Sequence, residues 1–126
     1  MIVCKRVYEP AGAEDGHRVL VDRLWPRGCS KASLPLDGWL RELAPSDEVR
    51  RAFAHEPERF AAFRSAYRAE LAAAPALWQP LLAQAKGSTL TLLYAAHDEE
   101  RNNARVLAEF LAEQLSATTV NPGAAS

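Results

Sequence analysis

The sequence predicts an α/β fold: a single compact domain with a small, mostly parallel sheet flanked by helices. Two short apolar segments, 19–21 and 89–94, are rich in β-branched and aliphatic residues, as strands buried on both faces are. A turn of polar residues follows each of them, and a long stretch with helical periodicity lies between. Because strand, polar turn and helix alternate, we expect parallel strands joined by helices.

Strands are expected at three alternating or apolar segments, namely 2–8, 17–21 and 89–94. Four segments have helical periodicity, namely 47–54, the segment from Pro57 to the break at Pro75, 77–86 (kinked or begun at Pro80) and 99–116. Ser46 and Asp98 are suitable N-caps for the first and last of these helices. Pro57 occupies the first turn of the second helix, where proline is tolerated.

The segment 36–44 is ambiguous. Its four apolar residues have the spacing of a helical face, but Gly38 and Pro45 leave only six residues between them, which is the length of a strand. The pattern alone slightly favours a helix.

Length and composition describe one domain of an ordinary globular protein. The chain has 126 residues and a formal net charge of −1, so composition indicates neither extended nucleic-acid binding nor membrane binding. We expect the domain at 1–117 and a flexible tail at 118–126. Cys4 and Cys29 lack a CxxC spacing and are expected to be reduced. No signal sequence or membrane-spanning apolar run is found, so we expect a cytoplasmic protein with no membrane partner.

A candidate site follows the strand at 17–21. Its polar and turn-forming residues are Asp22, Arg23, Trp25, Pro26, Arg27 and Gly28, and Lys31 adds a further cation. Guanidinium groups are planar forks that fit phosphate or carboxylate, and an indole can stack on a ring. An internal network of carboxylate and guanidiniums, with the tryptophan in the core, explains the same residues equally well.

A second polar group, 97–103, follows the strand at 89–94. Because the carboxyl ends of parallel strands share one edge of a sheet, we expect Arg27 and Asp98 to lie close together there. The N-terminus of the helix that begins here also favours an anion. Asp98 is explained more simply as the cap of that helix than as a catalytic group.

Several common site motifs are missing from the sequence. The nucleotide-binding motifs GxGxxG and GxxxxGK[ST] are absent, and so are HExxH, cysteine–histidine clusters and GxSxG. Pro35 stands six positions after Cys29, where a cysteine phosphatase has arginine. We therefore expect no metal site; the cofactor, the oligomeric state and the question of enzymatic activity stay open.

Long stretches of the chain resemble the bacterial DUF488 family and, within it, the YeaO-like branch. The stretches that carry the resemblance include GHRVLVDRLWPRG, WLRELAPS and LTLLYAAHDEERNNARVL. The resemblance implies a compact α/β domain and a short strand at 39–43. It also implies a set of site residues, namely Asp22, Arg23, Trp25, Pro26, Arg27, Lys31, Pro45, Ser46, Tyr94, Asp98 and Asn102.

The chain departs from the wider family at one place. Broader DUF488 members, which this chain resembles, have a CxExxxxxCHR pattern after the last strand. In this chain Tyr94 and Asn102 stand at the two cysteine positions, Ala96 stands at the glutamate position and Asn103 at the histidine position. Cysteine- or histidine-dependent chemistry of that pattern is therefore not expected here.

Three kinds of function fit these residues. In the first, Arg23, Arg27 and Lys31 bind a small anionic ligand of phosphate or nucleotide type, with Trp25, Pro26 and Ser46 also lining the site. Acid–base catalysis by Asp22 or Asp98, oriented by Tyr94 and Asn102, would make that site an enzyme. The second is a nucleic-acid-associated binding protein, which near-neutral net charge disfavours. The third is a non-catalytic domain that works through a protein partner.

Overall fold

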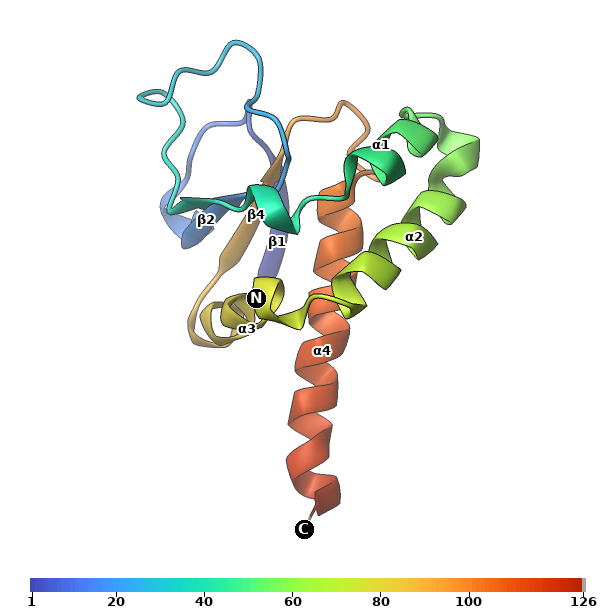
Figure 1. The fold of residues 1–126 in the computed structure, drawn as a ribbon. Helices are drawn as coiled ribbons and strands as arrows, with labels where there is room; N and C mark the ends of the chain where they lie inside the picture. The colour runs from blue at the N-terminus through green and yellow to red at the C-terminus, as the bar shows by residue number, and fades with distance from the viewer. Residues whose placement is uncertain (126) are drawn as a thin grey trace.

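The computed structural model describes the backbone of residues 1–125 and the side chains of residues 1–117. Its centre is a sheet with the strand order β1-β4-β2-β3, in which neighbouring strands run parallel. The strands are β1 (Ile2–Arg6), β2 (His17–Leu20), β3 (Gly38–Trp39) and β4 (Leu90–Tyr94). The predicted fold class, one compact α/β domain, is confirmed (Figure 1).

Strand β4 lies in the middle of the sheet, between β1 and β2. All five of its residues are buried. Leu90, Leu92 and Tyr94 contribute to the core on one face of the sheet, whereas Leu93 belongs to the core on the other. A strand covered on both faces needs no polar side, and for this reason its sequence is an uninterrupted apolar run.

The helices are α1 (Asp47–Phe53), α2 (Phe60–Ala72), α3 (Pro75–Gly87) and α4 (Asn103–Ala125). Side chains from all four pack into the core that contains Leu90, Leu92 and Tyr94, so the helices cover one face of the sheet. Helices α2 and α4 lie against each other there (Figure 1). The apolar stripe of α2 is buried as its spacing predicts.

An irregular segment covers the other face of the sheet. Leu34 and Leu93 are buried there. Trp25 and Trp39 pack edge to face with their ring centroids 5.3 Å apart, and the Trp25 indole donates a hydrogen bond to the Cys29 carbonyl (2.6 Å). The turn after β2 is therefore anchored by its aromatic side chain, which holds the polar residues around it in place.

The strand expected at 39–43 is shorter than predicted. Pairing with β2 involves Gly38 and Trp39, and the Leu40 amide still donates to the Leu20 carbonyl (2.9 Å). The chain then turns into a 3-10 helix at Arg41–Leu43, because Leu43 has to enter the helical side of the core. The apolar spacing in this segment thus reflects a strand followed by a turn.

Two helix boundaries are also corrected. Helix α3 begins at Pro75 and not at 77, since proline fits the first turn of a helix, and Pro80 lies within it. Helix α4 is Asn103–Ala125, whereas 99–116 was expected. The flexible tail expected at 118–126 falls on residues whose side chains lie outside the description, so it stays a prediction.

A buried charge cluster fastens the loop before β2. Asp15 is 6% exposed, and its carboxylate accepts hydrogen bonds from the Gly12 amide (3.0 Å), the Lys5 ammonium (3.1 Å) and the Arg18 guanidinium. The hydrogen bond from Gly12, supported by those from Lys5 and Arg18, holds the pKa of Asp15 below its ordinary value. Lys5 is therefore committed to this cluster.

Two further expectations concern thiols and membranes. Cys4 and Cys29 are free thiols. Burial raises the pKa of Cys4 to about 11. Within the part of the chain that the structure describes, none of the helices has the length and apolar character needed to cross a bilayer.

Candidate functional site

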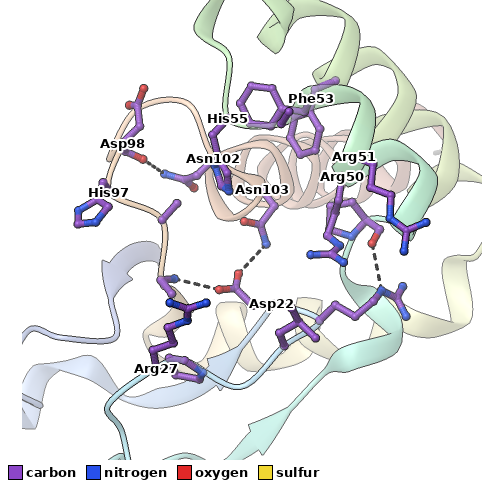
Figure 2. Close-up of a pocket in the computed structure, with 18 of the residues that line it drawn as sticks. Asp22, Arg27, Arg50, Arg51, Phe53, His55, His97, Asp98, Asn102 and Asn103 are labelled. Atoms are coloured by element: carbon purple, nitrogen blue, oxygen red, sulfur yellow. Dashed lines mark hydrogen bonds between the residues drawn. The ribbon is translucent and has the colours of Figure 1, made fainter.

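A cavity of about 1060 Å³ lies at the carboxyl ends of β2 and β4 (Figure 2). Its walls come mainly from four segments, namely 22–27 after β2, 50–55 at the end of α1, 95–98 after β4 and 102–103 at the start of α4. Ligands of parallel sheets bind beyond these strand ends. Arg27 and Asp98, which are far apart in the sequence, line this one cavity, as their positions after two strands predicted.

Asp22 follows β2 and points into the cavity (Figure 2). Its carboxylate accepts hydrogen bonds from the Ala95 amide (2.9 Å) and from the side-chain amide of Asn103 (3.0 Å). Burial raises the pKa of the Asp22 carboxyl, and these two hydrogen bonds oppose that shift. Asp22 therefore ties the exit of β4 to the start of α4, and it does so through neutral donors.

Four arginines line the cavity. Arg23 and Arg27 come from the turn after β2, and Arg50 and Arg51 come from α1. Two aspartates, Asp22 and Asp98, also belong to the lining. With the histidines neutral, the lining carries two more positive than negative charges on a chain whose net charge is −1. The cavity lining therefore has a local excess of positive charge where the two strands end.

The arginines differ in how strongly they are held. Arg23 donates to two backbone carbonyls at 3.2 Å each, and Arg50 donates to Asp47 at 2.8 Å. The Nε of Arg50 is buried, and no described residue accepts a hydrogen bond from it. Arg27 and Arg51 are exposed, and their side chains form no hydrogen bond or ion pair with the described part of the chain.

Backbone conformation brings His55 to the cavity. Ala54 and His55 follow α1 with φ angles of 50° and 57°, in the left-handed region that disfavours residues with a Cβ. The Ala54 amide closes the helix on the Arg50 carbonyl (3.0 Å), and the His55 ring lies 5.8 Å from that of Phe53. Two successive left-handed residues reverse the chain at the cavity wall.

We expect the Ala54→Gly variant to be more stable than the wild type by about 1 kcal/mol, because glycine adopts the left-handed conformation without steric cost. Chemical denaturation followed by circular dichroism measures this difference. The matched control is Ala69→Gly, at an exposed position inside α2, which should lose about 1 kcal/mol. Equal destabilisation of both variants would contradict the strain at Ala54.

The hydrogen bonds of the turn between β4 and α4 correct the role predicted for Asp98. Asn102, and not Asp98, caps α4, since its side-chain oxygen accepts from the Arg105 amide (2.9 Å). Asp98 caps its own turn by accepting from the amides of Glu100 (2.9 Å) and Arg101 (3.0 Å). These backbone hydrogen bonds, from Arg101 first, lower the pKa of Asp98. Helix α4 starts late because the chain makes this turn before it.

The remaining residues expected at the site fall into two groups. Trp25, Pro26 and Pro45 line the cavity. Tyr94, Ser46 and Lys31 do not belong to its lining. Tyr94 is 2% exposed in the helical core, where burial raises its pKa; Ser46 accepts from the Val49 amide (3.2 Å) as the cap of α1; and Lys31 is exposed.

Several residues of the lining were not assigned to the site from the sequence, among them Arg50, Arg51 and His55 at the end of α1 and Asn103, which donates to Asp22. Two arginines in the last turn of a short helix are explained by the helix dipole alone, so their spacing contains no signal for a site. Only the direction in which α1 crosses the end of the sheet brings them to Asp22. Within the described residues, no cluster of histidine, cysteine and acidic side chains is suited to hold a metal ion.

Comparison with known proteins gives a family. The model of the inactive DUF488-N3 subclade matches residues 1–126. The chain belongs to this family. Among relatives, this DUF488-N3 protein is 51% identical over 110 residues to the uncharacterized protein YeaO of Escherichia coli, covering 87% of this chain and 96% of the relative. It is 42% identical over 107 residues to the uncharacterized protein Rv3073c of Mycobacterium tuberculosis, covering 84% and 89%. No solved structure matches.

The positions at which this DUF488-N3 protein differs from the CxExxxxxCHR pattern lie in or beside the cavity. Ala96, Asn102 and Asn103 line it at positions where the CxExxxxxCHR pattern of broader DUF488 members has glutamate, cysteine and histidine. Tyr94, at the first cysteine position, lies in the core beside it. At these positions the cavity lining of this chain therefore contains no cysteine, glutamate or histidine side chain.

Proposed function

We propose that this protein binds a small anionic ligand, of phosphate type, in the cavity at the ends of β2 and β4 and does not convert it. The observation that carries the proposal is the convergence of Arg23, Arg27, Arg50 and Arg51 from two separate elements on one cavity. Guanidinium groups bind phosphate oxygens by paired, charge-assisted hydrogen bonds. Four of them around one space favour an anion there over any neutral compound.

Unused hydrogen-bonding capacity supports a ligand in this position. Arg27 and Arg51 have no ion-pair partner among the described residues, and the buried Nε of Arg50 has no acceptor. Buried donors in native proteins almost always find an acceptor, and this one can be satisfied by water or by an oxygen of a ligand in the cavity. A phosphate oxygen is such an acceptor.

Binding without turnover is favoured by the positions of Asp98 and Tyr94. Asp98 is engaged by two backbone amides and by Arg101. Tyr94, expected to orient a substrate, is buried outside the cavity lining. The description of the subclade as inactive agrees with this interpretation.

The shape of the site favours a small molecule over nucleic acid. Its space of about 1060 Å³ is a concave site between α1 and the two strand-end turns, slightly larger than the usual small-molecule pocket of about 300–1,000 Å³. A nucleic-acid surface of this size would instead present an extended row of cations to the backbone. Lys5 is paired with Asp15 and Arg6 donates to the carbonyls of Ala95 and Ala96, so neither extends such a row.

Titration with inorganic phosphate tests the proposal. We expect saturable binding by isothermal titration calorimetry at low ionic strength, weakened as salt is raised because added ions screen the arginines. A Lys86→Gln variant, which removes an exposed charge at the end of α3, should bind as the wild type does. Absence of heat and of thermal stabilisation at millimolar phosphate would reject the proposal.

A further inference from the structure

The geometry points to a second recognition element in the same cavity, and this inference rests on the proposed function. We propose that Asp22 selects ligands that carry an N–H donor, an amino or ring N–H group, in addition to their phosphate. The ligand class would then be amino-bearing phosphate esters and not simple anions.

Asp22 is an unusual group to find in this cavity. A carboxylate on the wall of a site for anions repels them, and its burial costs free energy unless it is paired. Four arginines line the same space, yet the hydrogen bonds of Asp22 come from the neutral donors of Ala95 and Asn103, and it has no ion pair within the described residues. Its negative charge is therefore available inside the cavity.

Hydrogen-bonding capacity remains on both oxygens. An ionised carboxylate can accept about four hydrogen bonds. Oδ2 of Asp22 accepts from Ala95 (2.9 Å), and Oδ1 accepts from Asn103 (3.0 Å). The two hydrogen bonds also fix the orientation of the carboxylate, so its free lone pairs are presented to the cavity at a defined place (Figure 2). An N–H group of a ligand is the complementary partner.

The rest of the lining agrees with a ligand that has a polar group at each end. The lining also includes the aromatic side chains of Phe53 and Phe63. These rings suit a carbon skeleton or a flat ring that joins the phosphate to the donor. An aliphatic ammonium and a nucleobase amino group share the required chemistry, and matched probes distinguish them.

Two pairs of probes isolate the N–H group. In the first pair, 2-aminoethyl phosphate is compared with ethyl phosphate; in the second, adenosine 5′-monophosphate is compared with purine riboside 5′-monophosphate, which lacks only the amino group. We expect the wild type to bind the donor-bearing member of at least one pair roughly tenfold or more tightly, as a hydrogen bond to a charged group provides. The pair that shows the preference identifies the source of the donor.

The Asp22→Asn variant tests whether this preference belongs to Asp22. We expect it to lose the preference while it binds inorganic phosphate at least as tightly as the wild type, since a repelling charge has been removed. A preference that persists in the variant would overturn the inference. Phosphate binding by the wild type with no preference in either pair would overturn it as well and leave the proposed function standing.

The test of ligand preference does not depend on the Asp22→Asn variant alone. If Asp22→Asn fails to fold, as circular dichroism would show, the two probe pairs on the wild type still decide whether the N–H group matters. If the wild type binds none of the phosphates, the proposed function fails and the inference fails with it. The two failures are thus distinguished by inorganic phosphate.

Discussion

Replacing Asp15 by alanine is expected to lower the free energy of unfolding by about 3 kcal/mol, the value typical of removing one partner from a buried ion pair. Asp15 and Arg18 are each 6% exposed, and Lys5 is bound to the same carboxylate at 3.1 Å. Without Asp15, the Arg18 guanidinium and the Lys5 ammonium stay largely buried with no carboxylate beside them. Urea denaturation at neutral pH measures the loss.

The same variant has an expected pH dependence. The pKa of Asp15 is lower in the folded protein than in the unfolded chain, chiefly because the Gly12 amide and then Lys5 and Arg18 donate to its charged form. Its contribution is therefore complete above the unfolded pKa and is lost as the pH falls through the lower, folded pKa. The stability gap between wild type and Asp15→Ala should narrow over that acidic range.

Glu113 provides the control for Asp15. It forms an ion pair with Arg68 at 2.6 Å, but its side chain is 52% exposed. Exposed ion pairs contribute about 1 kcal/mol or less, so Glu113→Ala should cost far less than Asp15→Ala. Similar losses in the two variants would show that the Asp15 cluster is not a buried anchor of the β2 loop.

The double variant Arg27→Gln, Arg51→Gln is expected to bind inorganic phosphate about 100-fold more weakly than the wild type, since each charge-assisted hydrogen bond contributes roughly tenfold when partly exposed. These two guanidiniums line opposite parts of the cavity and have no ion-pair partner within the described residues. Calorimetric titration at low salt measures the affinity. Because neither side chain holds the fold together, unfolding should be almost unchanged.

The Lys31→Gln variant tests whether the anion binds in the cavity or beside Lys31, where the sequence pattern placed it. Lys31 was expected to bind the ligand, but it is exposed and does not belong to the cavity lining. Its substitution should leave phosphate affinity within about twofold of the wild type, an effect of general charge only. A loss equal to that of the double arginine variant would place the anion site outside this cavity.

Most of the fold was predictable because the apolar patterns of the strands and helices match the side chains that are buried in the core. The apolar run of β4 and the stripe of α2, with Phe63, Tyr67 and Leu71, match their positions in the core. The segment at 36–44 was less predictable, since its apolar residues serve a two-residue strand and a 3-10 helix in succession. Periodicity assumes one element per segment and fails where a segment changes conformation.

The candidate site was predictable to the extent that it follows from strand ends. Asp22, Arg27 and Asp98 come after two parallel strands, and such positions meet at one edge of a sheet. Asp98 was assigned to the wrong cap because both Asp98 and Asn102 are good capping residues and nothing local distinguishes them. The approach of α1 is a matter of helix packing, which no local pattern encodes.

The fold class, the family and the position of the polar turns at the carboxyl ends of the strands could be predicted from residue order. A strand that is buried on both faces is an apolar run, and the polar residues that follow it mark its end. Tertiary structure alone decided that Arg50 and Arg51 join Arg23 and Arg27 around Asp22, and that Tyr94, Ser46 and Lys31 lie outside the cavity lining. The physical reason is that a cavity is enclosed by elements distant in sequence, and their relative placement depends on how the whole core packs.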